Sequence, residues 1–388
     1  MNRFTIPRDV YFGDNAVEYL AQVDAKRAFI VYDGTRLEED GTIARLQDYL
    51  RQAGVESTTF NEVDHDPSVE MVRNGLAKMN EFKPDLIVGV GGGSPIDAAK
   101  AMWIFYEHPE LSFEEAAKPF SLPKLRNKAH FIAITTTSGT ATEVTSFSVI
   151  TDEKTGIKYP IADFNITPDV AIVDTTLVET LPRGLVANTG MDALTHAIEA
   201  YTSNVASPFT DALAIKAIEM IMENLVASYR GDMEARKAMH IAQNLAGMAF
   251  SNAILGIVHS MAHKSGKVFD IPHGMINSIC LPHATRFNAK TAPEKYVDIA
   301  KRLHLEGETD QALIDALVAA IRNLQVNMDM AASFKDYGLS EELFLSKVDE
   351  IAAAAVLDPC TGTNPREINN AEMTALFKAA YYNTEVDF

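Results

Sequence analysis

The chain has 388 residues, of which 47% are apolar and 22% are charged, so it is long enough for two hydrophobic cores and has a globular composition. Its formal charge of −19 disfavours nucleic acids and anionic membranes as partners, because both would repel it. No apolar run approaches the roughly 20 residues of a membrane-spanning helix, and the first residues, MNRFTIPRDVYFGD, lack the features of an export signal. We therefore expect a cytoplasmic protein in which Cys280 and Cys360 are reduced.

Short apolar runs alternate with helical patterns in the first half of the chain. The expected strands cover residues 28–32, 57–60, 86–90, 131–134 and 170–173. Strands that alternate with helices predict a parallel sheet, which binds ligands at the carboxyl ends of its strands. Strand patterns nearly vanish after Leu181, so we expect this α/β domain to cover residues 1–181.

A glycine-rich turn follows the strand expected at residues 86–90, in the sequence DLIVGVGGGSPIDAAKA. Ser94 is expected to cap the next helix, with Pro95 at its first position and Asp97 completing a capping box. A strand, a bare turn and a helix N-terminus together offer backbone N–H groups to a phosphate. The spacing G-x-G-G-G-S departs from the G-x-G-x-x-G fingerprint, and a tight structural turn is the alternative.

A hydroxyl-rich stretch, TTTSGTATEVT at residues 135–145, follows the strand expected at 131–134. Threonine-rich sequences are often only strand edges. In the same half of the chain as the glycine turn, these hydroxyls instead predict a second set of hydrogen-bonding groups for a dinucleotide.

The second half, residues 182–388, is expected to be an all-α domain. The segments that begin at Asp211 and Gln311 carry apolar residues at the three-to-four spacing of amphipathic helices.

Six of the ten histidines lie between residues 190 and 283, among candidate metal ligands. These candidates are Asp192, His196, His259, His263 and His273. Asp192 and His196 are four residues apart in a helical pattern, as are His259 and His263, so each pair shares one helix face. His273 stands between a proline and a glycine, so we expect it in a turn. A carboxylate with imidazoles suits Fe(II) or Zn(II) rather than calcium or magnesium.

Each of these pairs alone is more typical of a surface pair or of a hydrogen-bonded buried histidine. Both pairs lie among apolar residues, however, and burying so many ionisable groups without a shared partner would cost on the order of several kcal/mol each. A shared metal ion removes this cost.

The motifs GGGSPIDAAK, YEHPE, TDEKTGIKYP, GMDALTHAIEAY and HSMAHKSG together resemble the iron-containing (group III) alcohol dehydrogenases. The resemblance extends from Phe12-Gly13 to Cys360. It is strongest to the alcohol dehydrogenase half of bifunctional aldehyde–alcohol dehydrogenases and to butanol, 1,3-propanediol and lactaldehyde-type dehydrogenases. The implied fold is dehydroquinate synthase-like: an α/β dinucleotide-binding domain followed by an all-α metal-binding domain.

The resemblance also implies the roles of individual residues in the helical half. The metal ligands are Asp192, His196, His259 and His273, with Fe²⁺ as the expected ion and Zn²⁺ as the alternative. His263 matches a histidine beside the metal that takes part in proton relay.

The cofactor implied by the resemblance is NAD, with NADP as the alternative. The implied contacts are Gly92, Gly93, Ser94 and Asp97 at the pyrophosphate, Thr136, Thr137, Thr140 and Thr145 along the cofactor, and Lys158 near the nucleotide ribose. Asp33 stands where an acidic residue would bind the adenosine ribose hydroxyls and repel a 2′-phosphate, which favours NAD.

Apolar residues are expected to line the substrate pocket. Phe250 and Cys360 match positions that border the substrate in the family, and Phe147 and Ile254 are plausible additions. Such a lining suits a short, uncharged primary alcohol or its aldehyde. We expect a homodimer or a larger homo-oligomer, as in the family.

Three alternatives to a short-alcohol dehydrogenase are open. The first is a diol, lactaldehyde or hydroxyacid dehydrogenase of the same family. A dehydroquinate synthase-like lyase would need clustered basic residues for an anionic substrate, and the metal segments offer few beyond Lys264 and Lys267. A non-catalytic metal-binding protein would leave the glycine turn unexplained.

Overall fold

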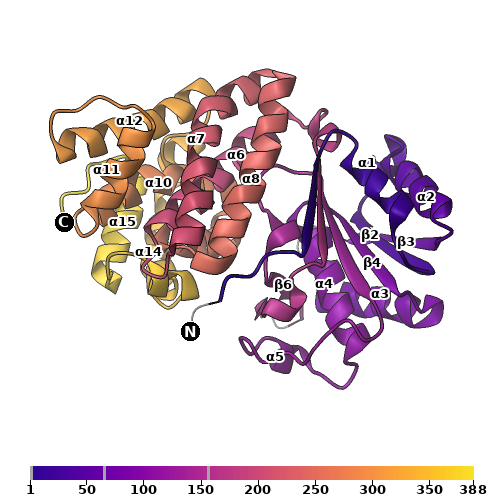
Figure 1. The fold of residues 1–388 in the computed structure, drawn as a ribbon. Coiled ribbons are helices and arrows are strands. Elements are labelled where there is room, and N and C mark those ends of the chain that lie inside the picture. Colours follow the sequence, from indigo (N-terminus) through magenta and orange to yellow (C-terminus); the bar gives the residue numbers. More distant parts are fainter. Residues whose placement is uncertain (1–2, 64–66, 155–157) are drawn as a thin grey trace. The chain divides into compact units, whose positions relative to one another are not determined.

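The computed structural model describes residues 3–63, 67–154 and 158–388. Contacts between Cα atoms divide the chain into two compact units, Met1–Thr180 and Leu181–Phe388. The first unit contains the sheet and the second is helical (Figure 1).

The first unit is built on a six-stranded sheet in the order β1-β8-β5-β4-β2-β3, and every neighbouring pair is parallel. Its strands are β1 (Asp9–Gly13), β2 (Arg27–Asp33), β3 (Glu56–Val63), β4 (Leu86–Gly91), β5 (His130–Thr135) and β8 (Val170–Asp174). All five strands expected from the sequence are confirmed. The sequence analysis missed β1, an edge strand without a buried residue, and the antiparallel hairpin of β6 (Phe147–Thr151) and β7 (Lys158–Ala162).

Helices cover both faces of this sheet, which explains why its central strands are apolar throughout. In β2, Phe29 and Val31 face the core that contains α3 (Val69–Phe82) and α4 (Gly93–Glu107), whereas Ala28 and Ile30 face the core that contains α2 (Thr42–Gln52). The helices are α1 (Arg36–Glu39), α2 (Thr42–Gln52), α3 (Val69–Phe82), α4 (Gly93–Glu107) and α5 (Phe113–Ala116), with short 3₁₀ turns η1 (Ala16–Gln22), η2 (Thr142–Val144), η3 (Phe164–Ile166) and η4 (Thr175–Val178). Figure 1 shows α3 and α4 on one side of the sheet and α1 and α2 on the other.

The second unit consists of helices. They are α6 (Arg183–Thr202), α7 (Pro208–Arg230), α8 (Met233–Ala253), α9 (Ile257–Phe269), α10 (His273–Ala289), α11 (Pro293–Arg302), α12 (Asp310–Asn327), α13 (Phe334–Tyr337), α14 (Glu341–Val356) and α15 (Asn370–Tyr382), with a 3₁₀ turn η5 (Pro359–Thr363). The two helices expected from residues 211 and 311 are confirmed as α7 and α12. Local signals define the ends of α7: Ser207 forms a capping box, Pro208 is its first residue, and Gly231 ends it at φ 99°.

Among the described residues, no single helix is long and apolar enough to cross a membrane. In the same described part of the chain, α8 and α9 together are long and apolar enough, but they are bent by 102° at the break between them.

Candidate functional site

Four donor side chains from three helices meet around one carboxylate oxygen in the second unit. Asp192 and His196 lie one turn apart on α6, His259 lies in the first turn of α9, and His273 is the first residue of α10. Oδ1 of Asp192 is 3.7 Å from Nε2 of His196 and 3.5 Å from Nε2 of both His259 and His273. Asp192, His196 and His259 are buried, whereas the His273 side chain is 42% exposed. The geometry therefore brings one oxygen and three nitrogen donors together, a set that suits Fe²⁺ or Zn²⁺.

The position of His273 depends on close packing at the start of α10. A side chain at Gly274 would place its Cβ 2.1 Å from the carbonyl oxygen of Asn188 on α6, so only glycine lets the two helices approach here. The expectation that His273 lies in a turn was wrong, because the helix begins at His273 itself, directly after Pro272.

Asn277, one turn after His273 on α10, lies among three of the four donor atoms. Its Nδ2 donates to Oδ1 of Asp192 at 2.7 Å and lies 3.2 Å from Nε2 of His259 and 3.1 Å from Nε2 of His273. One N–H group thus lies within hydrogen-bonding distance of the Asp192 oxygen and of two imidazole nitrogens. A cation fits the same charge pattern, so the residues present are suited to a metal ion.

Glu199 fixes the orientation of His259. Its Oε2 lies 2.6 Å from Nδ1 of His259, and its Oε1 accepts a hydrogen bond from the backbone N–H of Val258 at 2.7 Å. With Nδ1 as the donor to this carboxylate, Nε2 is the nitrogen on the side of Asp192, and it would supply the lone pair to a bound ion. Burial lowers the pKa of His259, but its bonds to Asp192 and Glu199 outweigh this effect and raise the pKa to about 9.

His263 lies beside this cluster and contacts a different carboxylate. Its ring centroid is 6.0 Å from that of His259 and 5.7 Å from that of His273. Its Nδ1 lies 3.2 Å from Oδ2 of Asp358, and its side chain is 39% exposed. His263 is therefore close to the four donors, but its Nδ1 contacts Asp358 rather than Asp192.

Of the residues expected to line a substrate pocket, three lie in the second unit. The ring of Phe250, near the end of α8, stacks on His196 with centroids 4.2 Å apart. Ile254 follows α8 with φ 59° and ψ −161°, a conformation that a β-branched residue adopts only under strain. Cys360 is buried in η5. Phe147 belongs to β6 of the first unit.

In the first unit, the glycine turn joins β4 to α4, but the helix starts earlier than the sequence suggested. The N-cap is Gly92 rather than Ser94, and it makes no side-chain capping bond. The expected capping box was also wrong, because the Asp97 carboxylate accepts instead from the backbone N–H of Val149 at 3.1 Å. Pro95 falls at the third helical position, still within the first turn, where its missing N–H has no intrahelical acceptor to lose.

The hydroxyl-rich segment packs against this turn. Near the start of the segment, the backbone N–H of Thr136 donates a hydrogen bond to the backbone oxygen of Gly91 at 2.9 Å. A Cβ on Gly92 would lie 3.2 Å from Oγ1 of Thr137, and one on Gly93 would lie 3.5 Å from Cγ2 of Thr140. Because these glycines have no side chains, space is left beside Thr137 and Thr140, two of the four threonines expected to contact the cofactor.

The other two expected threonines, Thr136 and Thr145, are buried. The Thr145 hydroxyl accepts a hydrogen bond from Nζ of the fully buried Lys100 at 3.1 Å. The same ammonium donates to the backbone oxygens of Thr142 at 2.8 Å, Thr145 at 2.7 Å and Phe147 at 3.0 Å. Lys100 thus ties the hydroxyl-rich segment to α4.

Asp33 lies at the point where the strand order of the sheet reverses. From β2, the chain adds β3 on one side and β4 on the other, and such a switch point binds ligands at the carboxyl ends of the two strands. Asp33 ends β2, and its Oδ1 would be 3.2 Å from a Cβ on Gly91, the last residue of β4. Lys158 begins β7, but its side chain lies outside the described part of the structure.

Two family descriptions match the chain. "Iron-containing alcohol dehydrogenase" covers residues 7–175, and "Fe-containing alcohol dehydrogenase family, C-terminal" covers residues 186–381. The chain belongs to the iron-containing alcohol dehydrogenase family. The resemblance inferred from its motifs is thereby confirmed.

Individual proteins that are similar to this iron-containing alcohol dehydrogenase align with nearly all of its length. It is 56% identical over 388 residues to the NADPH-dependent butanol dehydrogenase of Clostridium saccharobutylicum, with 100% of both chains covered. It is 41% identical to the bifunctional aldehyde-alcohol dehydrogenase of Escherichia coli K12, over 98% of this chain and 46% of that protein. A solved 1,3-propanediol oxidoreductase has a TM-score of 0.93 at 37% identity and covers 98% of this chain and 100% of its own. The predicted fold class is confirmed.

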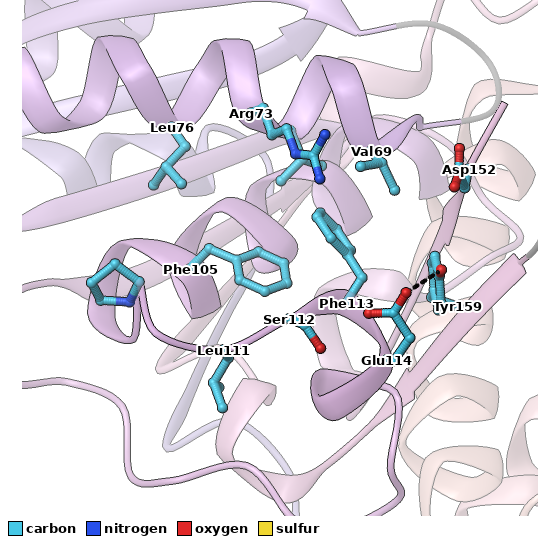
Figure 2. A pocket seen from close by; sticks show the side chains of 12 residues that line it. Val69, Arg73, Leu76, Phe105, Leu111, Ser112, Phe113, Glu114, Asp152 and Tyr159 are labelled. Atoms are coloured by element: carbon cyan, nitrogen blue, oxygen red, sulfur yellow. Dashed lines mark hydrogen bonds between the residues drawn. The ribbon is translucent and has the colours of Figure 1, made fainter. Parts of the chain in front are cut away.

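A hollow of about 270 Å³ lies elsewhere on the first unit of this dehydrogenase, between α3, α4 and α5 (Figure 2). In Figure 2, Tyr159 donates to Glu114 across its rim, at 3.0 Å, and Arg73 lies opposite. Among the residues whose side chains are described, none that was predicted to form a functional site lines this hollow. It is therefore distinct from the glycine turn.

Glu199 and Asn277 were not predicted from the sequence, although their spacing carries a signal. Glu199 follows Asp192 and His196 at seven and three residues, and Asn277 follows His273 at four, so each shares a helix face with a candidate ligand. Because glutamate and asparagine are common on helices, only their burial next to the ligands gives this spacing a meaning.

Replacing Glu199 with glutamine is expected to weaken iron binding by about 10- to 100-fold, the usual effect of removing a hydrogen-bonding partner behind a metal-bound histidine. Glutamine can still accept from the Val258 N–H, but it presents no second carboxylate oxygen to His259. Iron affinity measured by chelator competition tests this. An unchanged affinity, with correct folding shown by circular dichroism, would contradict the role of Glu199.

Proposed function

We propose that this chain is a metal-dependent, NAD(P)-linked alcohol dehydrogenase that interconverts a short primary alcohol and its aldehyde. The convergence of Asp192, His196, His259 and His273 on one point is the observation that carries the proposal. Family membership agrees with it, and the Clostridium relative is named a butanol dehydrogenase. The proposal assigns Fe²⁺ to the four side chains, with Zn²⁺ as the alternative.

Oxidation of an alcohol removes one proton and one hydride, and the two leave by different routes. A divalent ion at the four donors would act as a Lewis acid on the substrate oxygen. A bound nicotinamide would supply the hydride acceptor. The chain's own part in hydride transfer is to hold the dinucleotide, and we assign this role to the glycine turn, Thr137, Thr140 and Asp33.

We assign the proton transfer to His263. With Nδ1 as donor to Asp358, Nε2 is the nitrogen that can accept a proton from the substrate side, and the exposed ring can release it to solvent. Phe250, Ile254 and Cys360 present apolar surface, which suits a short alkyl chain and limits the entry of water.

The deciding experiment is an initial-rate assay of NADH and NADPH oxidation with acetaldehyde, butanal, 3-hydroxypropanal and lactaldehyde. The protein is reconstituted anaerobically with Fe(II), with Zn(II) or without metal. We expect metal-dependent turnover that is fastest with the simple aldehydes. Preference for 3-hydroxypropanal would favour the diol alternative, which the similarity to the 1,3-propanediol oxidoreductase supports. Metal-bound protein that reduces none of these carbonyls would overturn the proposal.

His263→Gln is expected to slow turnover by about 10² to 10⁴-fold, the usual contribution of a positioned proton-transfer group, while the iron content stays near one per chain. Metal analysis and kcat measured on the same preparation test this. Loss of iron from the variant would show that His263 is a ligand instead.

The preference between NADH and NADPH tests the role of Asp33. A carboxylate near the ribose hydroxyls favours NADH, whereas the Clostridium relative is named NADPH-dependent. Asp33→Asn is expected to raise kcat/KM for NADPH relative to NADH by about tenfold or more, because a like-charge contact with the 2′-phosphate is removed. An unchanged ratio would mean that Asp33 does not face the ribose.

The proposal also includes a cytoplasmic location and a homo-oligomeric assembly. Sedimentation velocity of the iron-loaded protein tests the assembly, and a monomer at all concentrations would contradict it.

A further inference from the structure

A second group of metal-binding side chains lies next to the four donors, in the same unit. One donor atom each from His263 on α9 and from Asp358 and Cys360 at η5 lies within 4.8 Å of the other two. None of these residues belongs to the set around Asp192. The group combines nitrogen, oxygen and sulfur donors, whereas the set around Asp192 contains no sulfur.

The carboxylate at the centre of this group already attracts positive charge. Oδ2 of Asp358 lies 2.8 Å from Nζ of Lys264 and 3.2 Å from Nδ1 of His263. Oδ1 accepts from the backbone N–H of Cys360 at 3.1 Å, so the turn of η5 fixes the carboxylate and the thiol on one short segment. Burial raises the pKa of Asp358, but its pairing with His263 and Lys264 outweighs this and holds the pKa well below its usual range.

The surroundings of the Cys360 thiol disfavour its thiolate, although Lys264 acts in the opposite direction. Burial and the neighbouring Asp358 carboxylate both raise its pKa. A divalent ion between the two side chains would reverse both effects, since it provides a bond to sulfur and cancels the negative charge of the carboxylate.

We propose that His263, Asp358 and Cys360 form a second cation site, which takes a thiophilic divalent ion such as Zn²⁺ or Cd²⁺. On binding, the bond between metal and sulfur forms, the S–H bond breaks, and the proton goes to solvent. The Nδ1 proton of His263 moves to Nε2, which frees the Nδ1 lone pair for the ion. Two positive charges then face one carboxylate and one thiolate, so the site is neutral.

Lys264 is the group that the ion must displace. Its ammonium occupies the same carboxylate oxygen, and its side chain is 34% exposed, so it can move into solvent. The exposed His263 gives an ion access from the same side. Sulfur ligation selects soft and borderline ions, whereas Mg²⁺ and Ca²⁺ prefer oxygen ligands.

An ion in this site would hold both the proposed proton carrier and a proposed pocket residue, so it is expected to inhibit the enzyme. This consequence rests on the proposed function, whereas the binding itself does not. Sulfur is the feature that separates the two sites experimentally, because only the second can give a cadmium thiolate.

The test adds Cd²⁺ to anaerobic protein loaded with one equivalent of Fe(II) and records the ultraviolet charge-transfer band of a cadmium thiolate. We expect the band to saturate at one equivalent of Cd²⁺ per chain in the wild type and to be absent from Cys360→Ser. Cys280→Ala is the matched control, because Cys280 is the other cysteine and is fully buried on α10. This variant is expected to keep the band. Cd²⁺ that replaces iron at Asp192 gives no such band, and iron analysis detects the exchange.

Lys264→Met gives a second, independent measurement. Removing the competing ammonium is expected to tighten Cd²⁺ binding by about tenfold. Unchanged Cd²⁺ affinity in this variant would contradict the part assigned to Asp358. The proposal is overturned if the wild type shows no thiolate band, or if the band persists in Cys360→Ser.

The aldehyde assay, run on the same samples, distinguishes this inference from the proposed function. A thiolate band together with inhibition supports both. A thiolate band in a protein that reduces no carbonyl leaves the second site standing and overturns only the proposed activity.

Discussion

Asp192→Asn is expected to abolish stable iron binding and to lower aldehyde reduction by more than about a hundredfold. Loss of a partner behind a metal ligand costs about 10- to 100-fold, so loss of the carboxylate that faces all three imidazoles should cost more. Asparagine keeps the volume and one acceptor oxygen for Nδ2 of Asn277, so the packing of α6 against α10 is retained. Iron per chain by elemental analysis and kcat/KM for butanal are the measurements.

The matched control is Asp349→Asn. Asp349 is exposed on α14 and accepts one long hydrogen bond, at 3.3 Å, from Thr374. The Asp349→Asn variant should keep full iron content and activity. An Asp192→Asn variant that retains iron with near-normal affinity would show that the metal binds elsewhere. In that case the second donor group at Cys360 would be the first place to search.

Local patterns were sufficient for most of the fold. The strand β2 reads as an uninterrupted apolar run because helices cover both faces of the sheet, and α7 carries its own start and stop signals. Long-range packing decided the features that were missed. The strand β1 pairs only with β8 and has no buried residue, so nothing in its own sequence marks it.

The start of α4 shows where local rules fail. Ser94 and Pro95 both favour a helix that begins after the glycines, yet Gly92 is the cap. Glycine is an acceptable cap, and the Asp97 carboxylate, which a capping box at Ser94 would need, instead accepts from the Val149 N–H of β6. A tertiary contact therefore overrode the capping box.

For the candidate metal site, the sequence supplied candidate ligands but not their arrangement. Helical spacing pairs Asp192 with His196, and His259 with His263, and gives no reason to separate the second pair. In the structure, His259 faces Asp192 whereas His263 faces Asp358, a residue 95 positions away in the sequence. The two histidines have different partners because α9 lies between residues of α6 and of η5. A local sequence pattern cannot predict this packing.

Lys100→Met is expected to destabilise the first unit by about 3–5 kcal/mol, the usual cost of removing one partner from a buried charge interaction. Methionine fills a similar volume, but it donates nothing to the backbone oxygens of Thr142, Thr145 and Phe147, which the ammonium now binds. Burial already lowers the pKa of Lys100, so the ammonium is retained because of these oxygens and the nearby carboxylates.

Urea unfolding followed by tryptophan fluorescence measures this effect. The chain has a single tryptophan, Trp103, which is fully buried one turn after Lys100 on α4, so its emission reports on the first unit. Lys78→Met is the matched control: Lys78 is half exposed on α3, and its pair with Glu62 is expected to contribute no more than about 1 kcal/mol. If the urea midpoint of Lys100→Met equals that of Lys78→Met, the structural role of the ammonium is contradicted.

The same variant tests the proposed cofactor site, because Lys100 holds the hydroxyl-rich segment against the glycine turn. Under conditions where the variant is folded, KM for NADH is expected to rise by about tenfold, equivalent to about 1.4 kcal/mol of lost binding. Iron content should stay unchanged, since the four donors belong to the other unit. A lower unfolding midpoint with an unchanged KM would mean that the segment stabilises the fold but does not contact the dinucleotide. The cofactor contacts would then be limited to the glycine turn and Asp33.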